Sequence, residues 1–254
     1  MKKNMKTKLL AILCVLVFAM QMMACGGGSE PAAGGQSGSG SESASGPYFD
    51  RGESVESIVT RAATAGTVGN WGLGNEYEIQ ALLTKYNQPT AFLSQAFDMN
   101  GFDDDSISLA SAMTYNELGL VVNDYDGGLG YGDSVGTIDM NSEGVAMLED
   151  NLFTTRAFAE ANPNTTAAFV AASVKGWAYA VANPEEAADI VFKHGSSVSP
   201  EHQAYMAKEV KKLVETDTKG NAVSATGNID DAAMQQTLDL AKTYIKLDDS
   251  AAAS

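Results

Sequence analysis

Residues 68–86, VGNWGLGNEYEIQALLTKY, place two glycines, an indole and acidic side chains between an extended run and a helical pattern. The stretch 67–71 suits a short β-strand. Asn75, with Glu78 three residues further on, has the capping-box spacing that begins a helix. We therefore predict a strand, a glycine loop and a helix whose buried face carries Ile79, Leu82, Leu83 and Tyr86.

Two further runs continue this pattern along the chain. Residues 91–97 (AFLSQAF) and 108–113 (SLASAM) are candidate strands, and the second leads directly into residues 115–117. Strands that alternate with helices predict an α/β fold with a parallel sheet. In open sheets of that kind, ligands bind at the carboxyl ends of the strands.

The candidate ligand-binding residues follow two of these strand ends. Glycines let the backbone approach a ligand, and the start of a helix offers free amide hydrogens. Amide and carboxylate side chains suit hydrogen bonding to a heterocycle, and aromatic rings suit stacking. We expect the two aromatic rings to face one crevice; the alternative is a tight turn with the indole in the core. The predicted site is Trp71, Gly72, Asn75, Glu76, Tyr115, Asn116 and Glu117.

Beyond Gly144 the pattern becomes mainly helical. One helix is interrupted at Pro163, and the next ends near Asn183. Residues 183–186 and 199–201 each place a capping side chain before a proline in the first helical turn, and the last helix begins at residue 230 or 231. We expect Trp177 and the phenylalanines here to lie in the core, the last helix to bury Met234, Leu238, Ala241 and Ile245, and His194 and His202 to take surface or capping roles.

The amino-terminal part has the pattern of an export signal. Lysines precede the apolar run 9–20, which is shorter than the roughly 20 residues that span a membrane, so residues 1–24 are interpreted as a secretory signal peptide. The sequence around Cys25 resembles the lipobox of bacterial lipoproteins, which implies acylation of Cys25; plain secretion is the alternative. Residues 25–47 are rich in glycine and serine and form a flexible linker.

Composition and motifs limit the function classes. Removal of the four lysines of residues 1–24 leaves 12 basic residues (16 − 4) against 32 acidic ones, a net charge of −20 (12 − 32), which argues against a nucleic-acid partner. Residues 103–105 are acidic but lack the ligand spacing of a calcium loop, and we interpret them as a solvated loop. No catalytic constellation and no metal-ligand spacing is present, so we predict neither a metal site nor a cofactor.

Four blocks in order carry a family resemblance: residues 68–86, 111–123, 144–191 and 201–210. The chain resembles solute-binding proteins of ABC importers, in the family shared with thiamine-pyrimidine synthases. The resemblance implies a type II periplasmic-binding-protein-like fold, with the ligand between two α/β lobes and delivery to a membrane permease. Residues 58–143 would form lobe two, and residues 144–248 the mainly helical carboxyl-terminal part of lobe one. Ligands of such relatives include thiamine-precursor pyrimidines, riboflavin and alkanesulfonates.

Two departures from the family pattern refine these expectations. The enzymatic branch carries a cysteine-rich run where residues 147–153 read MLEDNLF, which favours a binding protein over the alternative, a thiamine-pyrimidine synthase. The family's first βαβ segment has no counterpart after the linker, so lobe one is expected to be incomplete, and the helices after residue 144 to expose an apolar face. A non-binding remnant is therefore a further alternative. The main prediction is a lipid-anchored solute-binding protein on the outer face of the cytoplasmic membrane.

Overall fold

The computed structural model describes residues 49–50, 52–195, 197–223 and 226–245. The predicted signal peptide, the predicted acylation site Cys25 and the predicted linker lie outside these residues. The first described helix, α2 (Val55–Ala65), begins slightly before the expected boundary at residue 58. The Ser54 side chain accepts a hydrogen bond from the Ser57 amide, and Gly66 ends the helix in the left-handed conformation that glycine adopts without strain.

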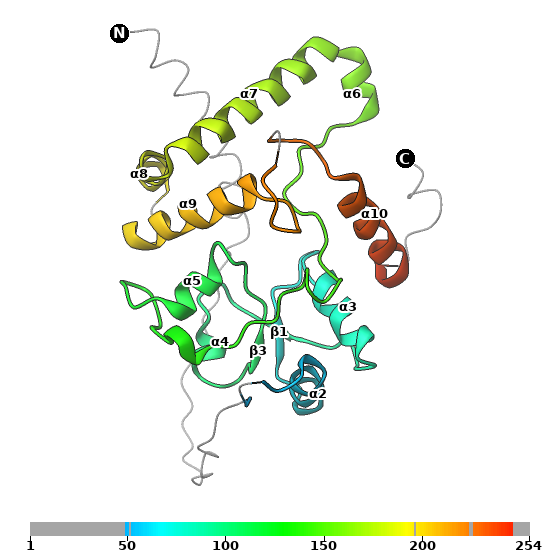
Figure 1. The fold of residues 1–254 in the computed structure, drawn as a ribbon, viewed down its shortest axis with the longest axis vertical. Coiled ribbons are helices and arrows are strands. Elements are labelled where there is room, and N and C mark those ends of the chain that lie inside the picture. Colours follow the sequence, from blue (N-terminus) through cyan, green and yellow to red (C-terminus); the bar gives the residue numbers. More distant parts are fainter. Residues whose placement is uncertain (1–48, 51, 196, 224–225, 246–254) are drawn as a thin grey trace, which may run out of the picture.

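The sheet is small and parallel, which confirms an α/β fold. Strand β1 (Val68–Asn70) lies between β2 (Leu93–Ser94) and β3 (Leu109–Ala110), in the order β2-β1-β3 (Figure 1). All three strands fall inside the predicted runs, but the paired segments are much shorter than those runs. The two-lobe arrangement stays a prediction.

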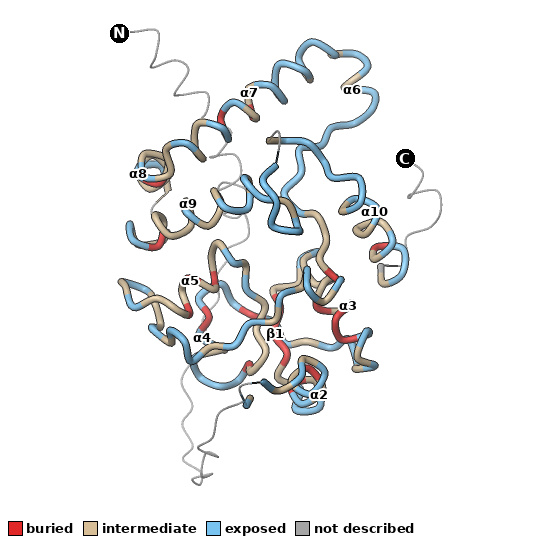
Figure 2. The backbone as a smooth tube through the Cα atoms, viewed as in Figure 1, coloured by how far each residue is buried: buried red, intermediate tan, exposed pale blue. Residues whose placement is uncertain are grey.

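Helix α3 (Tyr77–Lys85) supplies much of the core. As predicted, Ile79, Leu82 and Leu83 are buried, and they pack with Val59 of α2 and Val68 of β1. Figure 2 shows buried segments on α2, α3 and β1, which carry most of this cluster. Each fully buried leucine contributes on the order of 1.5–3 kcal/mol, so this cluster is the main stabilising element of the α/β body.

Shorter helices follow the second and third strands. Residues 103–105 are exposed, as predicted, but Asp103 is the last residue of helix α4 (Asn100–Asp103) and not part of a loop. Helix α5 (Glu117–Val122) begins soon after β3 and is followed by the 3₁₀ turn η1 (Gly132–Ser134).

The segment after residue 144 is helical, as predicted. Ser199 and Asp230 cap their helices with side-chain oxygens, whereas Asn183 makes no side-chain cap, so that capping prediction was wrong. The elements are α6 (Arg156–Ala161), α7 (Pro163–Ala182), α8 (Pro184–His194), α9 (Pro200–Glu215), α10 (Asp231–Leu240) and the π-helical turn η2 (Ala241–Ile245).

Several apolar side chains of this segment are exposed, contrary to the expected core placement. Phe169 on α7 is 56% exposed, and Phe158, Trp177 and Met234 are also exposed. Figure 2 shows α6 and the adjoining part of α7 mostly in the exposed colour. No described element covers α6 and the adjoining part of α7, so the apolar side chains there stay exposed.

The carboxyl-terminal helix packs on the α/β body. Leu240 and Tyr244 lie against the core cluster, and Ala241 is buried, as predicted. The Thr237 hydroxyl accepts a hydrogen bond from the Leu148 amide at 2.8 Å. Leu238 is half-buried, and the side chain of Ile245 lies outside the described residues. Helix α10 therefore stabilises α3 and the segment around residue 148 together.

Candidate ligand-binding site

Three polar side chains tie the strand ends together. Asn70, 2% exposed at the end of β1, donates from its side-chain amide to the Ser111 hydroxyl (2.9 Å) and to the Asn75 carbonyl oxygen (3.1 Å). Gln95, beyond β2, donates to the Ser111 carbonyl oxygen (2.6 Å) and accepts from the Ser111 amide (3.0 Å). Buried polar groups that satisfy one another in this way fix their elements, so the carboxyl edge of the sheet is preorganised.

The glycine loop after β1 is a tight turn held by the sheet. Gly72 and Gly74 have positive φ angles, as does Leu73, whose side chain is 95% exposed. The Asn70 side-chain oxygen accepts from the Gly72 amide (2.7 Å). The Glu76 carboxylate accepts from the Gly74 amide (2.8 Å). The glycines therefore supply the backbone angles that the turn requires.

The predicted cap of α3 was wrong. Glu76, not Asn75, occupies the N-cap position, and it makes no side-chain cap. The Asn75 side-chain amide instead donates toward the Glu149 carboxylate at 3.4 Å. The positive φ angles of residues 72–74 set the direction of the chain before Asn75. The Asn75 side chain therefore binds Glu149, which is distant in sequence, and does not cap the helix.

Trp71 has an aromatic partner that sequence reasoning missed. Its ring and that of Phe97, beyond β2, have centroids 6.4 Å apart and planes 13° from parallel. The indole Nε1 of Trp71 is buried and has no hydrogen-bond partner among the described residues. Phe97 is 56% exposed. A buried indole N–H without an acceptor costs about 1–3 kcal/mol.

Asn116 and Glu117 are engaged inside the protein. The buried Glu117 carboxylate accepts from the Met113 amide and from the Asn116 side-chain amide, each at 3.0 Å. Burial raises the pKa of Glu117, and these hydrogen bonds oppose that effect. Asn116 then presents its side-chain oxygen to His202 Nε2 at 2.8 Å. Both residues thus fix the start of α5 rather than pointing free polar groups at a ligand.

His202 lies in the interior, so the expected surface role was wrong; His194 is exposed, as expected. Because the Asn116 oxygen is an acceptor, Nε2 of His202 carries the proton and Nδ1 accepts from the Tyr125 hydroxyl. The Tyr205 ring stacks on the imidazole, and its hydroxyl donates to the Thr114 carbonyl oxygen (2.7 Å). Burial lowers the pKa of His202. These contacts join α9 to α5.

A cluster of carboxylates lies beside Asn75 and Tyr115. Glu149 is exposed as a residue, but partial desolvation of its carboxylate, followed by the charges of Glu78 and Asp150, raises its pKa to about 7. Burial also raises the pKa values of Glu78 and Asp150. Burial, and then the charges of Asp150 and Glu149, raise the pKa of Tyr115. Glu78, Glu149 and Asp150 are named here the acidic cluster.

The two halves of the predicted site meet through this cluster and not through their rings. No ring contact joins Trp71 and Tyr115 within the described part of the chain: Trp71 packs on Phe97, and Tyr115 is close enough to Glu149 and Asp150 to be affected by their charges. The shared crevice of the two rings stays a prediction. Glu149 was missed because its partners are distant in sequence, and only its place in an acidic dipeptide could have drawn attention to it.

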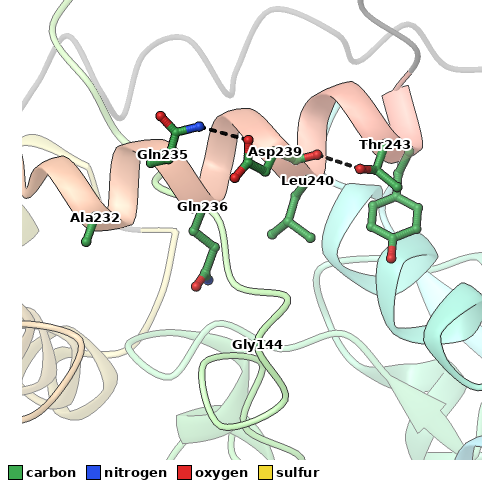
Figure 3. A pocket seen from close by; sticks show the side chains of 8 residues that line it. Gly144, Ala232, Gln235, Gln236, Asp239, Leu240 and Thr243 are labelled. Atoms are coloured by element: carbon green, nitrogen blue, oxygen red, sulfur yellow. Dashed lines mark hydrogen bonds between the residues drawn. The ribbon is translucent and has the colours of Figure 1, made fainter.

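An open surface recess lies away from these residues. It has a volume of about 490 Å³ and is bounded by α10, η2 and Gly144, with Gln236 and Leu240 pointing from the helix toward that loop (Figure 3). None of the predicted site residues lines it. Among the described residues, no group of three or more His, Cys, Asp or Glu side chains could hold a metal ion. None of the described helices is long and apolar enough to cross a membrane.

Comparison with known families supports the resemblance. Residues 67–187 match the model of the family described as NMT1/THI5 like. This family includes ABC solute-binding proteins and thiamine synthases, and most members are binding proteins. The matched segment runs from the residue before β1 into α8 and contains all seven predicted site residues. No curated protein and no solved structure was found to match the chain.

Proposed function

We propose that this chain is an extracytoplasmic solute-binding protein of an ABC importer, and that it binds a small heterocycle such as a thiamine-precursor pyrimidine or riboflavin. It is held at the outer face of the cytoplasmic membrane by acylation of Cys25 and delivers its solute to a permease in that membrane. The match of residues 67–187 to a family of mostly binding proteins supports the class. The proposed ligand is argued from the residues at the carboxyl ends of the strands.

The observation that carries the proposal is the unpaired indole of Trp71. Its buried Nε1–H lies at the carboxyl edge of a parallel sheet, where ligands of open α/β sheets bind. The neighbouring polar side chains of Asn70, Gln95 and Ser111 are hydrogen-bonded to one another or to the nearby backbone. Among the buried side-chain groups of the described residues, the indole is the one that lacks a hydrogen-bond partner, and a heterocycle with ring nitrogens or carbonyl oxygens would supply an acceptor.

The predicted residues take different roles in this proposal. Trp71, Gly72, Asn75 and Tyr115 contact the ligand, with Asn75 and Tyr115 beside the acidic cluster. Glu76 shapes the glycine loop through its bond to the Gly74 amide. Asn116 and Glu117 position the start of α5, because their polar atoms are bound to each other and to His202.

Isothermal titration calorimetry tests the proposal. The full chain in detergent is titrated with riboflavin, with 4-amino-5-hydroxymethyl-2-methylpyrimidine and with ethanesulfonate. We expect saturable heat with one of the two heterocycles, and a Kd weakened about 10- to 100-fold in Trp71→Ala, the range that loss of one aromatic stacking contact produces. Trp177→Ala is the matched control, because it removes an exposed indole from α7. Absence of heat with both heterocycles would refute the proposal.

A chain that has lost binding is the second candidate, and the exposed apolar residues of α6 and α7 favour it. Contiguous exposed apolar surface in a soluble protein marks a missing partner or an aggregation risk. On this alternative the chain binds the dye ANS strongly, melts without a sharp calorimetric transition and binds neither heterocycle. A sharp transition together with heterocycle binding would exclude it.

A further inference from the structure

The stacking of Trp71 on Phe97 indicates which kind of ligand binds at this edge of the sheet. This inference rests on the proposed function. The two residues follow the adjacent parallel strands β1 and β2, so their side chains arise at the same edge of the sheet. Their ring centroids are 6.4 Å apart with nearly parallel planes. Aromatic pairs have centroids about 4.5–7 Å apart, so this pair is near the loose end of the range. A loosely stacked pair can gain contact area when another flat ring packs against it.

Phe97 has no evident structural role at this position. It is more than half exposed, whereas its neighbours Gln95 and Met99 are buried and anchor the loop. Gln95 holds Ser111 through two hydrogen bonds. The loop conformation is therefore fixed without the Phe97 ring, which leaves a large apolar surface in water beside the indole. Burial of that surface against a ligand is favourable.

The acidic cluster, beside Asn75 and Tyr115, restricts the charge of a ring that contacts these two residues as well. The charges that raise the pKa values of Tyr115 and Glu149 all come from carboxylates: Asp150, Glu117, Glu78 and Glu149. An anionic ligand would be repelled by such an edge, whereas a neutral or cationic ring would not. An aromatic face also attracts cations.

We propose that Phe97 and Trp71 form one aromatic pair that holds a flat, uncharged or cationic heteroaromatic ring, and that an acceptor atom of this ring binds the indole N–H of Trp71. Phe97 is thus a specificity-determining residue outside the seven predicted ones. The pair selects flat rings over sulfonates, and the indole selects rings with an acceptor at their edge.

Tryptophan fluorescence of the full chain in detergent tests this inference. The chain has two tryptophans, Trp71 and Trp177, so Trp177→Phe leaves Trp71 as the reporter. The probes are riboflavin, 4-amino-5-hydroxymethyl-2-methylpyrimidine and ethanesulfonate. In this background we expect Phe97→Ala to weaken binding of the ring probe about 10- to 100-fold, by analogy with loss of a base-stacking aromatic side chain. Phe97→Tyr, which keeps the ring, retains binding, and ethanesulfonate causes no saturable change.

Phe169→Ala is the matched control, because Phe169 has the same exposed fraction as Phe97 but lies on α7. It should leave the Kd unchanged. If Phe97→Ala and Phe169→Ala both bind as the parent does while Trp71→Ala, measured by calorimetry because it removes the fluorescent reporter, does not, the aromatic pair is refuted and the proposed function stands. If neither ring probe binds the parent chain, both are refuted. If ethanesulfonate binds more tightly than the rings, the inferred ligand class is wrong.

Discussion

Replacement of Glu149 by glutamine should change how stability depends on pH. The pKa of Glu149 is raised from 4.5 to about 7 in the folded chain, first by burial and then by the charges of Glu78 and Asp150. The folded chain therefore holds this proton more tightly than the unfolded chain does. The corresponding stability is fully present below pH 4.5 and is lost as pH rises through about 7. Glu149→Gln has no such proton to lose.

The size of the effect follows from the same values. A pKa difference between 4.5 and about 7 corresponds to about 3 kcal/mol as an upper limit. Glu149 is exposed as a residue, and solvent screens much of the interaction, so we expect about 1 kcal/mol. At pH 8 the Glu149→Gln variant should be more stable than the wild type by this amount, and below pH 4.5 the two should converge.

Thermal unfolding followed by circular dichroism between pH 4.5 and 8 measures this difference. For a chain of this size, 1 kcal/mol shifts the Tm by about 2–4 °C. Glu160→Gln is the control, because it removes an exposed carboxylate of α6 and so accounts for the general change in net charge. Parallel Tm curves for Glu149→Gln, Glu160→Gln and the wild type across this range would show that the folded chain does not raise the pKa of Glu149.

Three further predictions concern packing, the strand ends and the anchor. Gly119→Ala should destabilise the chain by about 1–3 kcal/mol in urea unfolding, because the new Cβ would lie 2.2 Å from the Tyr205 ring; Gly195→Ala, in open space, should not. Asn70→Ala should lower the free energy of unfolding by about 1–3 kcal/mol, since it leaves buried hydrogen-bond partners unpaired; an unchanged urea midpoint would contradict this. Cys25→Ala should move the protein from the detergent phase to the aqueous phase in Triton X-114 partitioning; retention in detergent would argue against acylation.

Sequence patterns predicted those parts of the fold in which local signals and packing agree. Residues 68–86 combine an extended run, glycines and a 3.6-residue apolar period, and the structure places β1, the loop and α3 there. The apolar runs at 91–97 and 108–113 predicted longer strands than exist, because an apolar run does not reveal how many residues find a hydrogen-bonding neighbour.

The contacts of the candidate site could be predicted only in part. Trp71 was identified from its place after a strand, but its partner Phe97 follows the next strand, and no local spacing links the two. Asn75 has the spacing of a helix cap, yet its amide binds Glu149, which lies 74 residues away in sequence. His202 resembles a surface histidine in its local sequence; it is buried because Asn116 and Tyr125 offer it two hydrogen bonds.

The most direct test of the ligand site is the NMR signal of the Trp71 indole N–H in the full chain labelled with ¹⁵N-tryptophan. During titration with riboflavin or 4-amino-5-hydroxymethyl-2-methylpyrimidine, we expect the Nε1–H resonance of Trp71 to move saturably, because a ring acceptor binds it, while that of Trp177 stays in place. If the Trp71 resonance stays fixed at ligand concentrations that saturate binding, the ligand does not lie at this edge of the sheet.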